Sequence, residues 1–289
     1  MRAPKRSPAK SSPVRPRGKR EELPTASAAS PSSIALASEL TADAADVLER
    51  VRARSPRVHC ITNAVAQNFS ANMLLALGAV PSMTIAPDEV GGFAARADAL
   101  LVNLGTFDAE RRAAAEIAIG SVTEKGRPWV LDPVFVERSP PRTAFAKLLA
   151  SRRPSAVRLN RAEFTALADA PLSERGLGAY ALEIHAALGL TGETDLVTDG
   201  RRLARIANGH PLMAKVTAMG CAASAIVAAC LAVEPDAWKA TAAALMLFGV
   251  AGEIAGARAT GPGSFAAAML DAIYALDGEM LVGEARVAC

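Results

Sequence analysis

Gly220 and Cys221 lie where an apolar stretch that begins strand-like at Lys215 changes into a run of strong helix formers. A glycine turn that enters a helix leaves several backbone N–H groups free, and the helix dipole adds partial positive charge there. Such a turn can bind an anion, and the same field favours the thiolate form of a cysteine. This arrangement suits phosphoryl transfer to a hydroxyl group, with the cysteine accepting the proton. A small buried cysteine beside an ordinary helix turn is the alternative interpretation.

The 18 uncharged residues between Lys215 and Glu234 reach the lower bound for a membrane span. They are mostly alanine with threonine, serine and glycine, which partition weakly into lipid. A buried core helix is therefore the expected structure.

Three more residues with useful chemistry lie near the ends of short apolar stretches. Asp132 precedes a proline, where a carboxylate can reach a metal ion or a phosphate, or simply cap a turn. Glu163 follows Asn160 by three residues, where it can hold a Mg²⁺-bound water or complete a capping box. Arg158 lies within an apolar strand, and a charge there needs an anionic partner. Walker A and GxGxxG motifs are absent from the sequence, so neither a P-loop nor a Rossmann site is predicted.

The pattern of the chain predicts a scaffold that brings such strand ends together. From Thr41 onward, runs rich in Val, Ile and Leu alternate with helical stretches, the first helix running to Arg54. The predicted strands are Arg57–Ile61, Ser82–Ile85, Ala99–Leu104, Trp129–Leu131, Ala156–Leu159 and Asp195–Thr198, with a hairpin at Asp199-Gly200 and closing helices near 220–233, 237–255 and 263–281. This order predicts one doubly wound α/β domain over residues 41–289, whose mainly parallel sheet carries helices on both faces. Ligands are then expected at the carboxyl ends of the strands.

Residues 1–40 have a different composition from the rest of the chain. Six prolines, many serines and alanines, and clustered bases predict a disordered extension that lacks the apolar centre of a secretory signal. Eight Lys/Arg against three Glu give this extension a charge of +5, so residues 41–289 carry −2 of the total of +3. A nearly neutral domain argues against nucleic-acid binding. Four cysteines without metal-site spacing predict a reducing, cytoplasmic location, with organelle targeting by residues 1–40 left open.

A series of short motifs, in order along residues 58–265, resembles the hydroxyethylthiazole kinase family of the ribokinase-like superfamily. The motifs are Val58-His-Cys-Ile-Thr-Asn63, Asn68-Phe-Ser-Ala-Asn72, Leu74-Leu-Ala-Leu-Gly-Ala79, Asn103-Leu-Gly-Thr106, Leu131-Asp-Pro-Val134, Arg142-Thr143, Asn160-Arg-Ala-Glu163, Thr191-Gly-Glu193, Asn208-Gly-His210, Lys215-Val-Thr217, Gly220-Cys221 and Gly261-Pro-Gly-Ser-Phe265. Each motif is weak alone, and their shared order carries the resemblance.

The resemblance implies transfer of the γ-phosphate of ATP to the hydroxyl of 4-methyl-5-(2-hydroxyethyl)thiazole, a step of thiamine biosynthesis and salvage. It also implies Mg²⁺ as cofactor and a homotrimer with active sites between subunits, without nucleic acid or membrane as partner. By position, Cys221 matches the catalytic cysteine beside Gly220. The remaining matches are Arg158 and Thr191 to ATP-binding positions, Met83 and Ala218 to thiazole-contacting positions, and Asp132 and Glu163 to acidic positions near Mg²⁺ and phosphate.

Three departures from the family's pattern cluster on this site. Ala218 replaces a glycine, which is costly if the backbone has positive φ there, and Met219 enlarges the same loop. Phe135 and its neighbours to Arg138 replace glycines. The region between Glu163 and Thr191 is short, and the stretch before Thr191 is a poor strand. These departures keep two alternatives open: a kinase of another small alcohol, such as hydroxymethylpyrimidine, and a catalytically impaired paralogue that binds ligand.

Overall fold

Val, Ile and Leu fill the short strands of a nine-stranded sheet, because strands covered on both faces must be apolar throughout. The computed structural model describes residues 31–289. The strands are β1 Arg57–Ile61, β2 Val80–Ser82, β3 Ala99–Asn103, β4 Trp129–Asp132, β5 Ala156–Asn160, β6 Ala187–Thr191, β7 Asp195–Thr198, β8 Leu203–Ile206 and β9 Val287–Ala288. Their order is β2-β1-β3-β4-β5-β6-β7-β8-β9. The first six strands of this order run parallel and the last three pair antiparallel.

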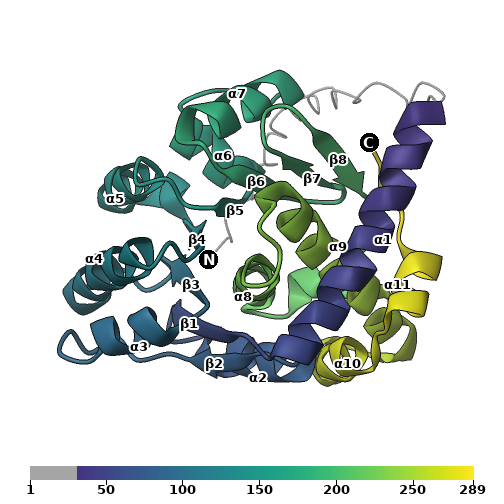
Figure 1. Ribbon diagram of the computed structural model, residues 1–289, viewed down its shortest axis with the longest axis horizontal. Coiled ribbons are helices and arrows are strands. Elements are labelled where there is room, and N and C mark those ends of the chain that lie inside the picture. The colour runs from purple at the N-terminus through teal and green to yellow at the C-terminus, as the bar shows by residue number, and fades with distance from the viewer. Residues whose placement is uncertain (1–30) are drawn as a thin grey trace, which may run out of the picture.

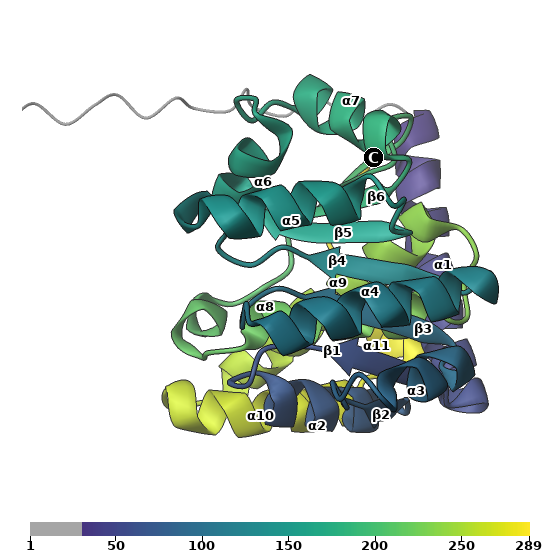
Figure 2. The same ribbon diagram turned by 90° about the vertical axis from the view of Figure 1, so that its left-hand side faces the viewer.

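Two helical layers enclose the sheet (Figure 1). The helices are α1 Pro31–Arg54, α2 Gln67–Leu77, α3 Val90–Arg96, α4 Ala109–Glu124, α5 Pro140–Ala150, α6 Arg161–Ala168, α7 Glu174–Ile184, α8 Met219–Leu231, α9 Ala237–Arg258, α10 Pro262–Ala275 and α11 Gly278–Glu284. Figure 2, turned by 90°, brings α3, α4 and α5 in front of the sheet. Helices α8 and α9 belong to the other layer, where the larger of two buried apolar clusters lies. The predicted doubly wound sheet is confirmed.

Helix α1 begins ten residues before the predicted start at Thr41. Residues 31–40, expected to be disordered, are helical, and Leu40 is fully buried against the core. Alanine and leucine in this stretch are good helix formers, and the stretch continues the helix α1, which packs on α9 and α11. The prediction of disorder is wrong for 31–40. The rest of the proposed extension, residues 1–30, lies outside the described residues.

The stretch before Thr191 is a regular strand, contrary to prediction. Residues Ala187–Thr191 form β6, which pairs in parallel with β5 and antiparallel with β7. Gly189 weakens the propensity of this strand, but a Cβ there would lie 3.0 Å from Thr241, so the glycine lets α9 pack closely. The region between Glu163 and Thr191 therefore contributes the strand β6, which joins β5 to β7 and leaves no gap in the sheet beneath the site.

Several boundaries also differ from prediction. The hairpin at Asp199-Gly200 is confirmed, with β7 and β8 antiparallel. The edge strand β2 ends at Ser82 instead of beginning there, because Gly78 ends α2 at φ +103° and the chain becomes extended at once. The stretch that begins at Lys215, expected to be strand-like, forms no strand: the 3-10 helix Pro211–Lys215 leads through a turn into α8. The last predicted helix is interrupted at Leu276, after which Asp277 caps α11.

Among residues 31–289, α9 is the one helix that is long and apolar enough to cross a membrane. The apolar window of this helix is 78% buried inside the protein. Helix α8, which sequence suggested as a marginal span, is buried from Ala222 to Leu231. Both helices are core helices in this fold, as the sequence predicted for α8.

Candidate functional site

The N-terminus of α8 lies at the carboxyl ends of the parallel strands. Ala218 is its N-cap, with left-handed backbone angles of φ +67° and ψ 0°. Gly220 lies against the guanidinium of Arg158, since a Cβ at this position would be 2.6 Å from Nη1. The glycine therefore allows an arginine from β5 to reach the first turn of α8, which strengthens the positive field that the helix dipole already provides.

Arg158 also contacts Thr191 at the end of β6, the neighbouring strand. Its Nη2 donates to Oγ1 of Thr191 at 2.5 Å, while its Nε has no partner among the described residues. Arg158, Thr191 and Gly220 share the lining of a cavity of about 590 Å³. An arginine with unused donors, a helix N-terminus and a cavity of this size can together bind a phosphorylated ligand.

Cys221 is held by an amide and is not poised as a thiolate. Asn63 Nδ2, after β1, donates to Sγ at 3.1 Å and to Asn103 Oδ1 at 3.1 Å. Burial and the nearby carboxylate of Asp132 raise the pKa of Cys221 to about 11, although the amides and Arg158 act in the opposite direction. The expectation that the helix field favours the thiolate is wrong here, because desolvation of the charged form exceeds the field.

Asp132 ends β4 and is completely buried. Its Oδ2 accepts from Ser224 Oγ at 2.8 Å and from Asn103 Nδ2 at 2.7 Å, whereas Oδ1 has no partner among the described residues. Burial raises the pKa of this carboxyl group, Arg158 lowers it and Glu163 raises it. A buried carboxylate oxygen without a donor is well suited to accept a cation or a water bound to one.

Glu163 is 3% exposed and completes the capping box that the sequence left as an alternative. Its Oε2 accepts from Asn160 N at 2.8 Å, and its Oε1 accepts from Phe135 N at 3.0 Å. The carboxylate thus fixes both the start of α6 and the loop after Asp132. Within residues 31–289, no group of three or more His, Cys, Asp or Glu side chains is arranged to hold a metal ion by itself. Mg²⁺ commonly uses one or two carboxylates plus substrate phosphates, and this donor set fits that pattern.

The loop after Asp132 has positive φ at two consecutive residues that are not glycine, Val134 at +31° and Phe135 at +56°. Arg142 holds this loop by donating from Nη1 to the Val134 carbonyl at 2.8 Å. The ring of Phe135 is half exposed and lies under the guanidinium of Arg138, 5.0 Å from its centroid. The side chain of Phe135 therefore does not fill the site, although its backbone is strained there.

The two predicted thiazole contacts lie in different places. Ala218 directly precedes the α8 turn, while Met83 follows the edge strand β2, one strand beyond β1 and Asn63. Met83 is half-buried against the larger apolar cluster, and it does not line the cavity that holds Arg158. Met219, expected to crowd the loop, is 5% exposed, packs in the same cluster and also lines the cavity that holds Arg158.

Sequence reasoning assigned no role to three residues that organise the site. Asn63 and Asn103 were named only as parts of the family motifs, yet they connect Cys221 to Asp132. Ser224 was not singled out. Its position three residues after Cys221 on an otherwise apolar helix is the signal that could have identified it, because that spacing places both side chains on one face.

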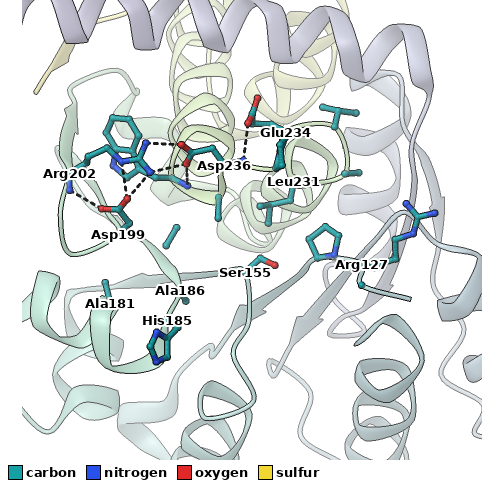
Figure 3. A pocket seen from close by; sticks show the side chains of 18 of the residues that line it. Arg127, Ser155, Ala181, His185, Ala186, Asp199, Arg202, Leu231, Glu234 and Asp236 are labelled. Atoms are coloured by element: carbon teal, nitrogen blue, oxygen red, sulfur yellow. Dashed lines mark hydrogen bonds and ion pairs between the residues drawn. The ribbon is translucent and has the colours of Figure 1, made fainter. Parts of the chain in front are cut away.

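A second cavity, of about 720 Å³, lies at the opposite end of the sheet. It is lined by Ser155 and Ala186, which precede β5 and β6. Figure 3 shows Arg202 donating to both Asp199 and Asp236 in this cavity. The predicted site residues, all of which fall in the described part of the chain, are absent from its lining. We therefore assign the chemistry to the carboxyl ends of the strands.

Comparisons with known proteins point in one direction. The model of the Hydroxyethylthiazole kinase family matches residues 48–279. A protein named "Probable hydroxyethylthiazole kinase" from Agrobacterium fabrum is 45% identical over 246 residues, covering 85% of this chain and 95% of its own. A hydroxyethylthiazole kinase from Klebsiella pneumoniae is 46% identical over 237 residues, covering 78% and 92%.

Solved structures agree with this relationship. The structure of a hydroxyethylthiazole kinase protein from Pyrococcus horikoshii superposes with a TM-score of 0.80 at 37% identity, covering 84% of this chain and 97% of its own. A ribokinase-like superfamily protein from Enterococcus faecalis gives a TM-score of 0.60 at 15% identity, covering 79% and 93%. At that identity the likeness concerns the fold, which is ribokinase-like.

Proposed function

This chain belongs to the hydroxyethylthiazole kinase family, and on that premise we propose that it transfers the γ-phosphate of ATP to the hydroxyl of 4-methyl-5-(2-hydroxyethyl)thiazole. The observation that carries the proposal is the contact of Arg158 with both Gly220 and Thr191. This contact joins an arginine, a helix N-terminus and a cavity of about 590 Å³ next to Cys221. A phosphate placed there would be bound by charge and by backbone N–H groups.

We assign the nucleotide to this cavity, with Arg158 and Thr191 at its phosphates. Nη1 of Arg158 lies beside Gly220, so it can donate to a phosphate oxygen at the α8 turn while Nη2 retains Thr191. The N–H groups of Gly220 and Cys221 begin α8 and can stabilise the charge that develops on the transferred phosphoryl group. In this arrangement the protein would accelerate the reaction by positioning the phosphates and stabilising their charge, the two effects that dominate phosphoryl transfer.

In this proposal Cys221 acts as a neutral thiol that positions the acceptor hydroxyl. A thiol with a pKa of about 11 is protonated at neutral pH, so its sulfur can accept a hydrogen bond from the hydroxyl but holds no thiolate charge beforehand. A largely dissociative transfer requires little proton removal before the phosphoryl group departs, which tolerates a weak base. Met83 and Ala218 would contact the thiazole, as the family's pattern implies.

Asp132 and Glu163 would hold Mg²⁺ together with water and phosphate oxygens. The unpartnered Oδ1 of Asp132 is the feature that fits a cation, and Glu163 fixes the loop beside it. When bound, Mg²⁺ neutralises phosphate charge. Asn103 and Ser224 orient the other carboxylate oxygen of Asp132, which restricts Oδ1 to one direction.

We also propose a homotrimer and a cytoplasmic location. Among residues 31–289, β2 has no strand on its outer side, and Val80 on this strand and Leu75 on the adjacent helix α2 are exposed apolar side chains. Exposed apolar side chains of this kind mark protein interfaces. Light scattering coupled to size exclusion would give the mass of a trimer; the mass of a monomer would contradict it. A cytoplasmic location is consistent with α9 being buried in the core.

An ADP-release assay tests the proposed function directly. With ATP and Mg²⁺, we expect turnover of the hydroxyethylthiazole and none of hydroxymethylpyrimidine. Turnover of the pyrimidine alone would replace the acceptor in this proposal. If neither alcohol is phosphorylated while ADP still binds, the protein is an impaired member of its family and the proposal is wrong.

A further inference from the structure

The loop from Asn208 to Met213 forms one wall of the cavity assigned to the nucleotide. This loop lies directly on the backbone of α9. A Cβ at Gly249 would lie 2.8 Å from Asn208, and one at Gly256 would lie 2.4 Å from the ring of His210. Both distances are shorter than real Cβ contacts, so glycines on one side of α9 allow the loop its position. The shape of the cavity therefore depends on how firmly this loop is held.

Glu253 of α9 holds the start of the loop from outside the cavity. Its Oε1 accepts from Gly209 N at 2.9 Å, and its Oε2 accepts from Asn208 Nδ2 at 3.1 Å. Although burial alone would raise the pKa of Glu253, hydrogen bonds from Arg286, Gly209 and Asn208 lower it. Glu253 is consequently ionised at neutral pH. Gly209 adopts φ +149°, which favours glycine and makes this backbone sensitive to the loss of an anchor.

Arg286, which directly precedes β9, completes the arrangement from a segment remote in sequence. Both of its terminal nitrogens donate to the carboxylate of Glu253, with Nη1 at 3.0 Å from Oε2. Nη2 also donates to the Ala207 carbonyl at 2.8 Å, and the backbone N–H of Arg286 donates to Asn208 Oδ1 at 2.7 Å. A bidentate pair of this kind fixes direction as well as distance. Arg286 thus holds Glu253 in the orientation that anchors Asn208 and Gly209.

We propose that Arg286 is a positioning residue for nucleotide binding, acting through Glu253 on the Asn208–Met213 wall of the cavity. Arg286 does not line the cavity, so its effect is transmitted by the loop. The proposal rests on the proposed function, which assigns this cavity to ATP. It extends that function, because it makes affinity for the nucleotide, but not for the alcohol, depend on the segment from Glu284 to Cys289.

Isothermal titration with ADP tests this proposal without requiring turnover. We expect Arg286→Gln to raise the Kd for ADP about fivefold, in the range seen for positioning residues outside a site. The Kd for the thiazole should not change. Arg286→Lys keeps a charge beside Glu253 and should fall between the wild type and Arg286→Gln. In the turnover assay, Arg286→Gln should raise KM for ATP while leaving KM for the thiazole unchanged.

Arg205→Gln is the matched control. Arg205 lies on β8, pairs in register with Ala288 of β9 and donates to Glu174 at 2.7 Å, away from the loop. Its loss removes another Arg–Glu pair of the same sheet edge, in which the arginine is 40% exposed against 54% for Arg286, and should leave the Kd for ADP unchanged. Equal weakening of ADP and thiazole binding by Arg286→Gln, or wild-type ADP affinity in that variant, would overturn the proposal.

The proposed function can fail separately. If wild-type protein binds ADP and Arg286→Gln weakens this binding, but no alcohol is phosphorylated, the positioning role stands and the assigned reaction does not. If the wild type binds no ADP, the assignment of the cavity is wrong and the role of Arg286 is refuted with it.

Discussion

Replacing Ala218 with glycine should stabilise the protein and increase turnover. Ala218 has φ +67° and ψ 0°, a left-handed conformation that costs an L-residue with a Cβ about 1–2 kcal/mol relative to glycine. This gain in the free energy of unfolding is reduced by roughly 0.4–1 kcal/mol, because glycine loses more backbone entropy on folding. Ala218 is also the N-cap of α8 without a side-chain hydrogen bond, and glycine is preferred to alanine at an N-cap. The net expectation is a gain of about 0.5–1 kcal/mol in the free energy of unfolding.

Thermal unfolding can resolve a change of this size. For a domain this large, about 1 kcal/mol corresponds to a shift of roughly 2–4 °C in Tm, so Ala218→Gly should raise Tm by about 2 °C. Ala113→Gly is the matched control, since Ala113 lies within α4. It should lower stability by roughly 0.5–1 kcal/mol. Opposite signs for the two variants are the expected result.

Ala218 is expected to affect catalysis because it lies directly before the first turn of α8. The carbonyl of Ala218 accepts from Ala222 N at 2.9 Å, so the N-cap is part of the first turn that carries Gly220 and Cys221. Removal of the backbone strain at residue 218 should let this turn close on the phosphoryl group. We therefore expect kcat to rise. A lower Tm for Ala218→Gly, matching that of Ala113→Gly, would refute the argument from backbone strain. A higher Tm with lower kcat would show that alanine serves the acceptor pocket.

Four further predictions concern the site itself. Cys221→Ala should lower kcat about 100-fold by misplacing the acceptor hydroxyl, and unchanged kcat would remove the thiol from the mechanism. Because burial raises the pKa of Cys221 to about 11, the rate of its alkylation by iodoacetamide should increase about tenfold per pH unit from pH 8 to 10. The rate for a free cysteine levels off near pH 9, and a similar early plateau for Cys221 would mean that its thiolate is already present. Arg158→Gln should raise KM for ATP at least tenfold by removing donors to phosphate, and a change confined to KM for the thiazole would place Arg158 elsewhere. Chelation by EDTA should stop turnover and excess Mg²⁺ should restore it, while activity that persists in EDTA would leave Asp132 without the assigned metal.

The strand-and-helix pattern predicted the fold because burial on both faces of a parallel sheet requires apolar strands, and this requirement is visible in sequence. Errors occurred where tertiary contacts override local preference. Ala187–Thr191 has poor strand propensity but lies between β5 and β7, which supply both hydrogen-bonding partners. Residues 31–40 have a disordered composition but extend a helix, α1, that packs on α9 and buries Leu40. Neither partner can be inferred from the segment alone.

Some site residues could likewise be identified from the sequence, and others could not because their role depends on tertiary contacts. Arg158 was singled out because a charge on an apolar strand needs a partner, and its contacts with Thr191 and Gly220 follow that reasoning. Asn63 and Asn103 could not be assigned from sequence, because an asparagine at a strand end usually serves a turn. Their role depends on which strands are neighbours, namely β1 with β3 and β3 with β4.

Cys221 shows where local reasoning gives the wrong sign. The dipole of α8 favours the thiolate, and that effect can be read from a glycine before a helix. Burial favours the neutral thiol, and the negative charge of the Asp132 carboxylate acts in the same direction. Desolvation of a buried charge can shift a pKa by several units, whereas a helix terminus contributes up to about 2 kcal/mol in a partly buried site, between one and two units. Burial therefore prevails, and in the proposed reaction the sulfur would hold an acceptor hydroxyl in place beside Gly220 while Arg158 and the backbone of α8 would stabilise the phosphoryl charge.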